Sequence, residues 1–106
     1  MSGYRLSKEA SEDLVAIYIQ EHDQFGPRQA DRYQDDLDAL FRRLAATPTI
    51  ARLRLEYAPP VRVFVFKAHV IIYDQEPDGV LIQRVRHGHE DWQGDPYGSS
   101  DEGDHP

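Results

Sequence analysis

The sequence contains no cysteine, which excludes disulfides and thiolate metal ligands and fits a reducing cytoplasm. It also has no long apolar run. The opening segment MSGYRLSKEA has no hydrophobic region of the kind found in signal peptides, and no later stretch approaches the length that crosses a bilayer. We therefore expect a cytoplasmic protein without a membrane segment. Its 106 residues suffice for one domain with a modest core.

Basic residues are outnumbered: 12 Lys and Arg stand against 19 Asp and Glu, which gives a net charge of −7. Four of the acids follow Gln93 with no base among them, which leaves 15 acids and 12 bases in the body of the chain. Such a body lacks the positive surface with which proteins hold nucleic-acid phosphates. Residues 94–106 offer almost nothing to pack, so we predict a folded domain over 1–93 and a disordered acidic tail over 94–106.

Two amphipathic helices are predicted in the first half of the chain. The first follows Ser7, a favoured N-cap residue, and ends before Gly26-Pro27. Its apolar face carries Ala10, Leu14, Ile17 and Tyr18, and its opposite, solvent-facing side carries Glu12, Asp13, Gln20 and Glu21. The second helix has apolar residues every three or four positions from Ala30 to Leu44 and stops at Thr47-Pro48. The short connection predicts an antiparallel helical hairpin.

Three segments rich in β-branched and aromatic residues follow a connector over residues 49–60: Val61–Phe66, Val70–Tyr73 and Val80–Val85. The link Lys67-Ala68 is short enough only for a tight hairpin, and Glu76-Pro-Asp-Gly79 is strong turn chemistry. Tyr4–Leu6 is compatible with an edge strand. The expected fold is α+β with the order β-α-α-β-β-β, in which the N-terminal helical hairpin packs on a small antiparallel sheet.

Four stretches in this order resemble the RelE/ParE superfamily of bacterial toxin–antitoxin toxins. They are the opening Tyr4–Ala10, Arg62 at the start of a strand, His69–Tyr73, and the terminal strand with its exit, Ile82–Trp92. The last stretch, IQRVRHGHEDW, is the most specific and is similar to the end of ParE-type toxins. The resemblance covers about Tyr4 to Gln93.

The resemblance implies one of two activities. RelE-type members are metal-free, ribosome-dependent mRNA endonucleases that use basic side chains and an acid–base residue. ParE-type members poison DNA gyrase by stabilising its DNA cleavage complex. The acidic helices and the few arginines of this chain favour the ParE type. A third hypothesis is a non-toxic module that only binds its antitoxin and tunes operon repression.

The ParE-type interpretation also implies the partners. We expect a ribbon-helix-helix antitoxin of the ParD kind in a hetero-oligomer, a heterotetramer or larger, with DNA gyrase as the target. DNA would be contacted only indirectly through the antitoxin, and no cofactor is expected. The antitoxin would be a disordered segment that folds on binding, by helix-in-groove or strand-addition contacts beside the helices and along the sheet edge.

The candidate target-binding residues lie at the end of the last strand: Arg84, Arg86, His87, His89 and Trp92. The two arginines are predicted either to contact a target or to pair with acids of the helices. Trp92 is predicted either to cap a small core or to anchor an interface. For Tyr73, we favour a core aromatic over a catalytic phenol.

A nuclease would instead use His87 or His89 as acid–base groups together with Arg62 and Arg84. The two histidines are two positions apart, so on a strand they would share one face. The alternative is that they are exposed polar residues without catalysis, and this is the interpretation we favour. A metal site formed with His69 is not expected, because no other residues show ligand spacing.

Overall fold

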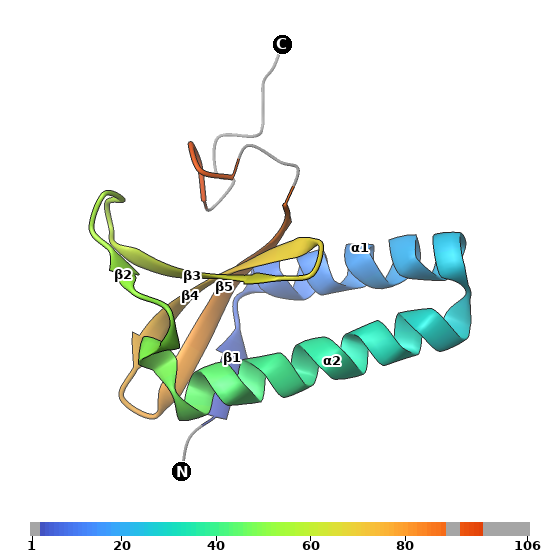
Figure 1. Cartoon of the computed structure of the whole chain (residues 1–106), viewed down its shortest axis with the longest axis horizontal. Coiled ribbons are helices and arrows are strands. Elements are labelled where there is room, and N and C mark those ends of the chain that lie inside the picture. Colours follow the sequence, from blue (N-terminus) through green and yellow to red (C-terminus); the bar gives the residue numbers. More distant parts are fainter. Residues whose placement is uncertain (1–2, 89–91, 97–106) are drawn as a thin grey trace.

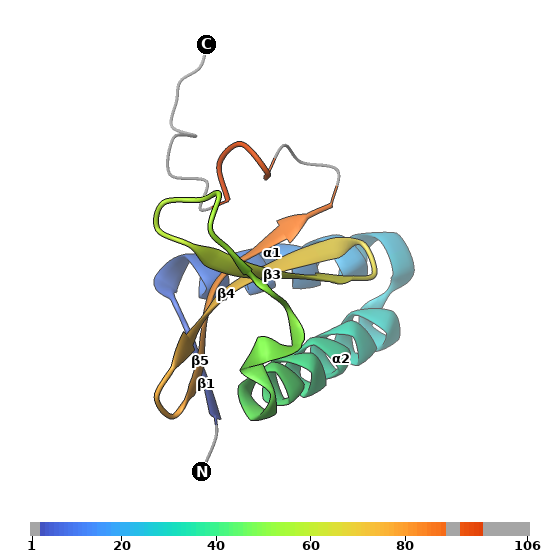
Figure 2. The same cartoon turned by 60° about the vertical axis from the view of Figure 1, so that its left-hand side comes forward.

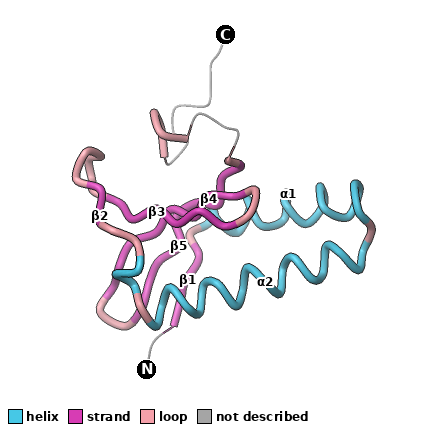
Figure 3. The backbone as a smooth tube through the Cα atoms, in the orientation of Figure 1, coloured by secondary structure: helices cyan, strands magenta, loops and turns pink. Residues whose placement is uncertain are grey.

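The part of the chain described by the computed structural model, residues 3–88 and 92–96, forms two long helices and one five-stranded sheet (Figure 1). The elements in chain order are β1 (Gly3–Leu6), α1 (Lys8–Phe25), α2 (Pro27–Ala46), the 3-10 helix η1 (Pro48–Ile50), β2 (Leu53–Arg54), β3 (Val61–Phe66), β4 (His69–Glu76) and β5 (Gly79–His87). Figure 3 shows the two helices as a hairpin whose connecting turn at Gly26 lies at the end away from the sheet.

The sheet has the strand order β1-β5-β4-β3-β2. The predicted meander is confirmed: β3, β4 and β5 pair antiparallel in sequence. The α+β order is confirmed as well, with two additions that the sequence did not indicate. The edge strand β1 runs parallel to β5, so the sheet is mixed, and β2 arises from two residues inside the expected connector.

The main core lies between the helical hairpin and one face of the sheet. The predicted stripe of α2 is buried there, and all of its members are at most 5% exposed: Ala30, Tyr33, Leu37, Leu40, Phe41 and Leu44. The Ser7 hydroxyl caps α1 by accepting from the Ala10 amide at 2.9 Å. The same hydroxyl donates to the Gln83 carbonyl at 2.7 Å, so the start of α1 is fixed to β5.

Helix α1 departs from its predicted faces. Ala10 and Ile17 are buried as expected, but Asp13 turns toward β5 instead of the solvent. Val15 and Ile19 are 60% and 55% exposed, because α1 is apolar on more of its circumference than one core contact can cover. A shallow groove at these two residues also involves Leu14, Tyr18 and Gln34.

A second, smaller core covers the opposite face of the sheet. Five residues are buried in it, namely Val61, Val63, Val70, Ile72 and Trp92, and Tyr57 packs against them. Figure 2 shows the segment that follows β5 on the side of the sheet away from α2. The sheet therefore buries both faces, one under helices and one under the segment that contains Trp92. In the described ranges, no helix is long and apolar enough to cross a membrane.

Candidate functional site

The exit of β5 is held to helix α1 by Asp13. The Arg84 guanidinium donates two hydrogen bonds to the Asp13 carboxylate, Nε to Oδ2 at 2.8 Å and Nη2 to Oδ1 at 2.9 Å. The Val85 amide donates to the same carboxylate at 2.9 Å. Both charged side chains are about one-sixth exposed, at 16% for Arg84 and 15% for Asp13. The carboxylate therefore serves as an ion-pair partner and as a cap for the strand edge.

A β-bulge explains why Arg84 can reach the helix. Ile72 of β4 is opposite Arg84, but the next residue, Tyr73, is opposite Ile82, so Gln83 is an extra residue in β5. A bulge bends the strand and redirects the side chains beside it. Of the two interpretations of Arg84, pairing with a helix acid is the contact that the structure contains.

Arg86 points to the opposite face of the sheet and is 7% exposed. Its Nη1 donates to the carbonyl oxygens of Asp95 and Pro96, at 2.9 and 3.1 Å. The described chain thus continues past Gln93 to Pro96, and Arg86 holds this segment against the sheet. The predicted disordered tail begins at residue 94; residues 94–96 are described and Arg86 bonds to two of them, whereas residues 97–106 lie outside the described residues.

His69 and His87 lie side by side at the exit of β5, directly opposite each other on β4 and β5. Their ring centroids are 5.3 Å apart in an edge-on arrangement. His69 is buried, and its Nδ1 lies 2.6 Å from the Tyr33 hydroxyl of α2. Burial, followed by the charges of Glu21 and Asp36, raises the pKa of the Tyr33 phenol to about 12. The phenol thus keeps its proton, and its hydroxyl can donate to His69 in the tautomer whose Nδ1 accepts.

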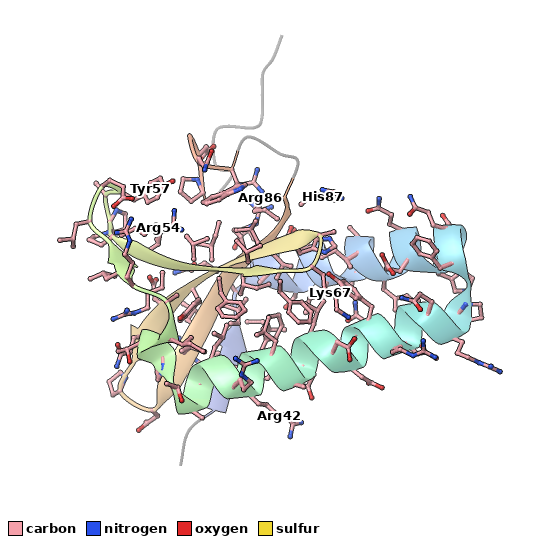
Figure 4. All side chains as sticks on the ribbon, viewed as in Figure 1. Arg42, Arg54, Tyr57, Lys67, Arg86 and His87 are labelled. Atoms are coloured by element: carbon pink, nitrogen blue, oxygen red, sulfur yellow. The ribbon has the colours of Figure 1, made fainter. Side chains whose placement is uncertain are left out.

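A polar hollow lies between α1 and the end of β5, and the residues at its walls include Asp13, His69, Arg84, Arg86 and His87. His87 is half-buried at its rim. Figure 4 shows Arg86 and His87 at this end of β5. Arg54, at the end of β2, and Tyr57 lie on the segment that leads into β3. His89 was predicted to share this site, and it lies outside the described residues.

Trp92 is 8% exposed and packs in the second core. The Arg54 guanidinium carbon lies 5.7 Å from the centre of its ring, within the range of a cation–π contact. Two positions were predicted for Trp92, a cap on a small core and an interface anchor. The structure contains the core position. Tyr73 is also a core aromatic, fully buried, and its hydroxyl donates to the Pro48 carbonyl at 2.7 Å.

Arg62 does not join the histidines. It is opposite Tyr73, whereas His69 is opposite Phe66, four residues further along β3. At about 3.3 Å per residue this places Arg62 roughly 13 Å along the strand from the histidine end. Its guanidinium instead donates to the Ala51 carbonyl at 2.6 Å and to the Gln75 side chain at 3.2 Å. The nuclease set is therefore divided between two ends of the sheet in the described structure.

Sequence reasoning missed Asp13 and the Tyr33 contact to His69. Asp13 lies three residues after Ala10 and four before Ile17, so helical spacing places it beside the buried face, and only its acidic character pointed to the solvent. Its partner is 71 positions away in the chain. No local spacing signals a contact of that range.

Comparisons with known proteins place this geometry in a family. The family model described as "ParE toxin of type II toxin-antitoxin system, parDE" matches residues 4–92. The chain is 32% identical over 87 residues to Toxin ParE1 of two Mycobacterium tuberculosis strains, CDC 1551 / Oshkosh and ATCC 25618 / H37Rv. The alignment covers 81% of this chain and 89% of each relative.

A solved structure described as "Chromosomal ParDE TA system from P. aeruginosa" contains a similar chain, with a TM-score of 0.69 and 20% identity. The match covers 82% of this chain and 96% of that chain, and it shows the shared fold. The class is thus a two-helix α+β toxin fold. The chain belongs to the ParE toxin family of type II toxin–antitoxin systems.

Proposed function

We propose that the chain is a cytoplasmic toxin that poisons DNA gyrase by stabilising its DNA cleavage complex, without catalysis by the toxin itself. The observation that carries the proposal is the construction of the β5 exit. Arg84 is paired with Asp13, Arg86 is buried against the C-terminal segment, and His69 is buried against Tyr33. These contacts hold the side chains of the β5 exit in fixed positions, so the exit offers a partner protein a preformed binding surface.

The target surface on this proposal is the stretch from Arg84 to Trp92. His87 contributes directly at the rim, and Arg84, Arg86 and Trp92 fix the shape of the exit from beneath. His89 belongs to the same proposed surface by sequence. The ribosome-dependent nuclease needs Arg62 beside the histidines, and the separation of about 13 Å along β3 gives it less support.

We further propose that a ParD-like ribbon-helix-helix antitoxin neutralises the toxin in a hetero-oligomer, a heterotetramer or larger, and that DNA is bound through the antitoxin alone. The acidic body of the chain supports indirect DNA contact. The exposed apolar residues Val15 and Ile19 on α1, with the groove at Leu14 and Tyr18, offer a surface for an amphipathic helix.

The test uses purified toxin in two parallel reactions. The first contains gyrase and plasmid, with linear DNA as the readout; the second contains translating ribosomes, with primer extension on the mRNA. We expect linear DNA to accumulate while the mRNA stays intact. Codon-phased mRNA cuts with unaffected gyrase would overturn the proposal in favour of the nuclease. Inactivity in both reactions, with antitoxin binding intact, would favour the non-toxic module.

A matched pair of variants assigns the surface. His87→Ala at the β5 exit is expected to reduce linear DNA about tenfold or more, as for loss of one contact at an interface centre. His22→Ala, an exposed histidine near the end of α1, serves as the control and should leave the yield unchanged. Equal yields from both variants would remove His87 from the proposed surface.

A further inference from the structure

The two edges of the sheet differ in how they are closed. On one side, β1 pairs with β5 from Gly79 to Ile82. Beyond that point α1 takes over: the Ser7 amide donates to the Ile82 carbonyl, the Ser7 hydroxyl to the Gln83 carbonyl, and the Val85 amide to Asp13. This edge is covered by the chain's own groups almost to the exit of β5.

The other edge is open over most of β3. The two residues of β2 pair with Val61 and Arg62, and from Val63 to Phe66 no described strand lies on that side. A two-residue hairpin closes with a hydrogen-bonded pair, here Phe66 with His69, and bonding alternates along an antiparallel ladder. The N–H and C=O groups of Val63 and Val65 therefore point away from β4, toward the open edge.

Within the open stretch there is no proline and no lysine or other charged residue to prevent strand pairing. Exposed edges are normally interrupted by lysine, proline or inward-pointing charges. Here the stretch reads Val-Phe-Val-Phe, with no charged residue between Arg62 and Lys67. Val65 is 65% exposed, although valine favours burial. These are the features of a strand that receives another strand.

A groove runs beside this edge on the helix side. It lies between α2, with Asp36, Ala39, Leu40 and Arg43, and the tip of the β3–β4 hairpin, with Phe66 and Lys67. Figure 4 shows Lys67 at that tip, on the side of the hairpin that faces α2. A strand added to β3 would direct alternate side chains into this groove and the others to the face of Val65.

The charges around the groove indicate the chemistry of its occupant. Lys67 pairs with Asp36 at 2.9 Å. Arg43 forms no ion pair with any described residue, and its guanidinium carbon lies 6.0 Å from the centre of the Phe64 ring. An arginine in this position on an acidic protein attracts a carboxylate.

We infer that β3 accepts an extended segment of the antitoxin as an added strand, with apolar side chains over Phe64 and Phe66 and an acidic side chain at Arg43. The inference rests on the proposed antitoxin partner and adds where one segment of it binds. It is separate from the helix surface at Val15 and Ile19, which lies on α1.

Residue-resolved amide exchange tests the inference on the full chain, with the full-length ParD-like antitoxin of the proposed pair as the probe. In the free toxin, we expect fast exchange at Val63 and Val65 and slow exchange at Phe64 and Phe66, which bond to β4. In the complex, Val65 should become protected by at least about tenfold, since an added strand would bond its N–H. Unchanged exchange at Val65 in a formed complex would overturn the inference.

A pair of variants separates the backbone donor from the side chain. Val65→Pro removes the N–H on the open edge and leaves the bonds to β4, whereas Val65→Ala keeps the N–H. We expect antitoxin affinity to fall about tenfold for V65P relative to V65A. Equal affinities for two folded variants would contradict strand addition. If V65P does not fold, the exchange measurement decides.

A charge-reversed pair tests the acidic side chain. Arg43→Glu should weaken antitoxin binding by about fivefold or more, and the effect should shrink at high salt. Arg42→Glu changes net charge equally, but Arg42 already pairs with Asp38 on an exposed face, so it is the control. Equal losses from the two variants would overturn the assignment of Arg43.

The outcomes distinguish this inference from the proposed function. A complex that forms without protection at Val65 overturns the added strand alone. Absence of any complex overturns the antitoxin proposal and the added strand with it. Protection at Val65 in the toxin alone, growing with toxin concentration, would show that a second copy of this chain occupies the edge and would overturn the antitoxin as the occupant.

Discussion

Single polar side chains connect the helices of this protein to its sheet. Asp13 holds Arg84 and the Val85 amide, Ser7 caps α1 while it bonds β5, and Tyr33 contacts His69 across the main core. Apart from the Ser7 cap, each contact joins residues that are distant in sequence. Removing one partner of a buried polar pair costs more free energy than the pair contributes when it forms. These residues should therefore be sensitive to substitution.

Asp13→Asn should destabilise the fold markedly. The amide oxygen can still accept from Val85, but the charge opposite Arg84 is lost, and a mostly buried cation remains. We expect the free energy of unfolding to fall by about 2–3 kcal/mol in urea denaturation. Glu12→Gln, an exposed neighbour on the same helix, should change it by less than about 0.5 kcal/mol. Similar urea midpoints for both variants would contradict the role of the ion pair.

Two tyrosines predict how stability depends on alkaline pH. Burial is the main cause that raises the pKa values of Tyr4 and Tyr33 from 10.0 to about 12; a hydrogen bond to Asp38 adds to the effect at Tyr4. The folded state thus holds these protons more tightly than the unfolded chain. Their stabilisation is complete below pH 10 and is lost as the pH rises toward 12.

Urea denaturation across this pH range, with tyrosinate absorbance followed in parallel, checks the prediction. The free energy of unfolding should decline from pH 10 upward, and part of the tyrosinate signal should appear only near pH 12. Complete ionisation of the tyrosines near pH 10 in a folded protein would contradict it.

At the scale of elements, the parallel pairing of β1 with β5 is the most constrained feature. Gly79 has φ +150 and is opposite Gly3 in the register. A Cβ atom placed on Gly79 would lie 1.7 Å from the Gly3 carbonyl oxygen, which is a backbone atom and cannot rotate away. The turn residue therefore also determines where the N-terminal strand can bind.

Gly79→Ala should detach β1 and lower the free energy of unfolding by about 2–4 kcal/mol. Gly3→Ala is the matched control, because nothing lies within 4 Å of a Cβ at that position. Thermal unfolding gives the stability, and amide exchange at Ser7, which donates to Ile82, reports the pairing directly. A G79A variant with unchanged exchange at Ser7 would contradict the constraint.

The elements that could be predicted from the sequence are those with a local signal. The stripe of α2 follows the helical period, and the turns at Lys67-Ala68 and Pro77-Asp78 separate three β-rich runs. By contrast, β2 is two residues long, too short for a period to be visible. The parallel direction of β1 follows from a pairing between residues more than 70 positions apart, which no window of sequence contains.

The site shows the same division. The sequence identified the β5 exit, because basic and imidazole residues follow a core strand there. It could not indicate that Arg86 would be buried against Asp95 and Pro96, or that Arg84 would find Asp13. Those contacts depend on a bulge and on the path of the segment that contains Trp92.

At the scale of the whole molecule, the sheet buries both faces and leaves three surface regions to which we assign the proposed contacts. One region is the β5 exit, which we assign to the target. The others are the apolar side of α1 and the open edge of β3, which we assign to the antitoxin. Phe66, at the end of the open β3 edge, is opposite His69, which is opposite His87, so the proposed antitoxin strand would end two strands away from the β5 exit.

The most direct test of the account is a titration of purified toxin against a fixed amount of gyrase and plasmid, with linear DNA measured at completion. A poison acts by remaining bound, so linear DNA should rise with toxin and level off when toxin and gyrase amounts are comparable. An enzyme turns over, so traces of toxin would suffice. Full effect from catalytic amounts of toxin, or no linear DNA at any amount, would contradict the account.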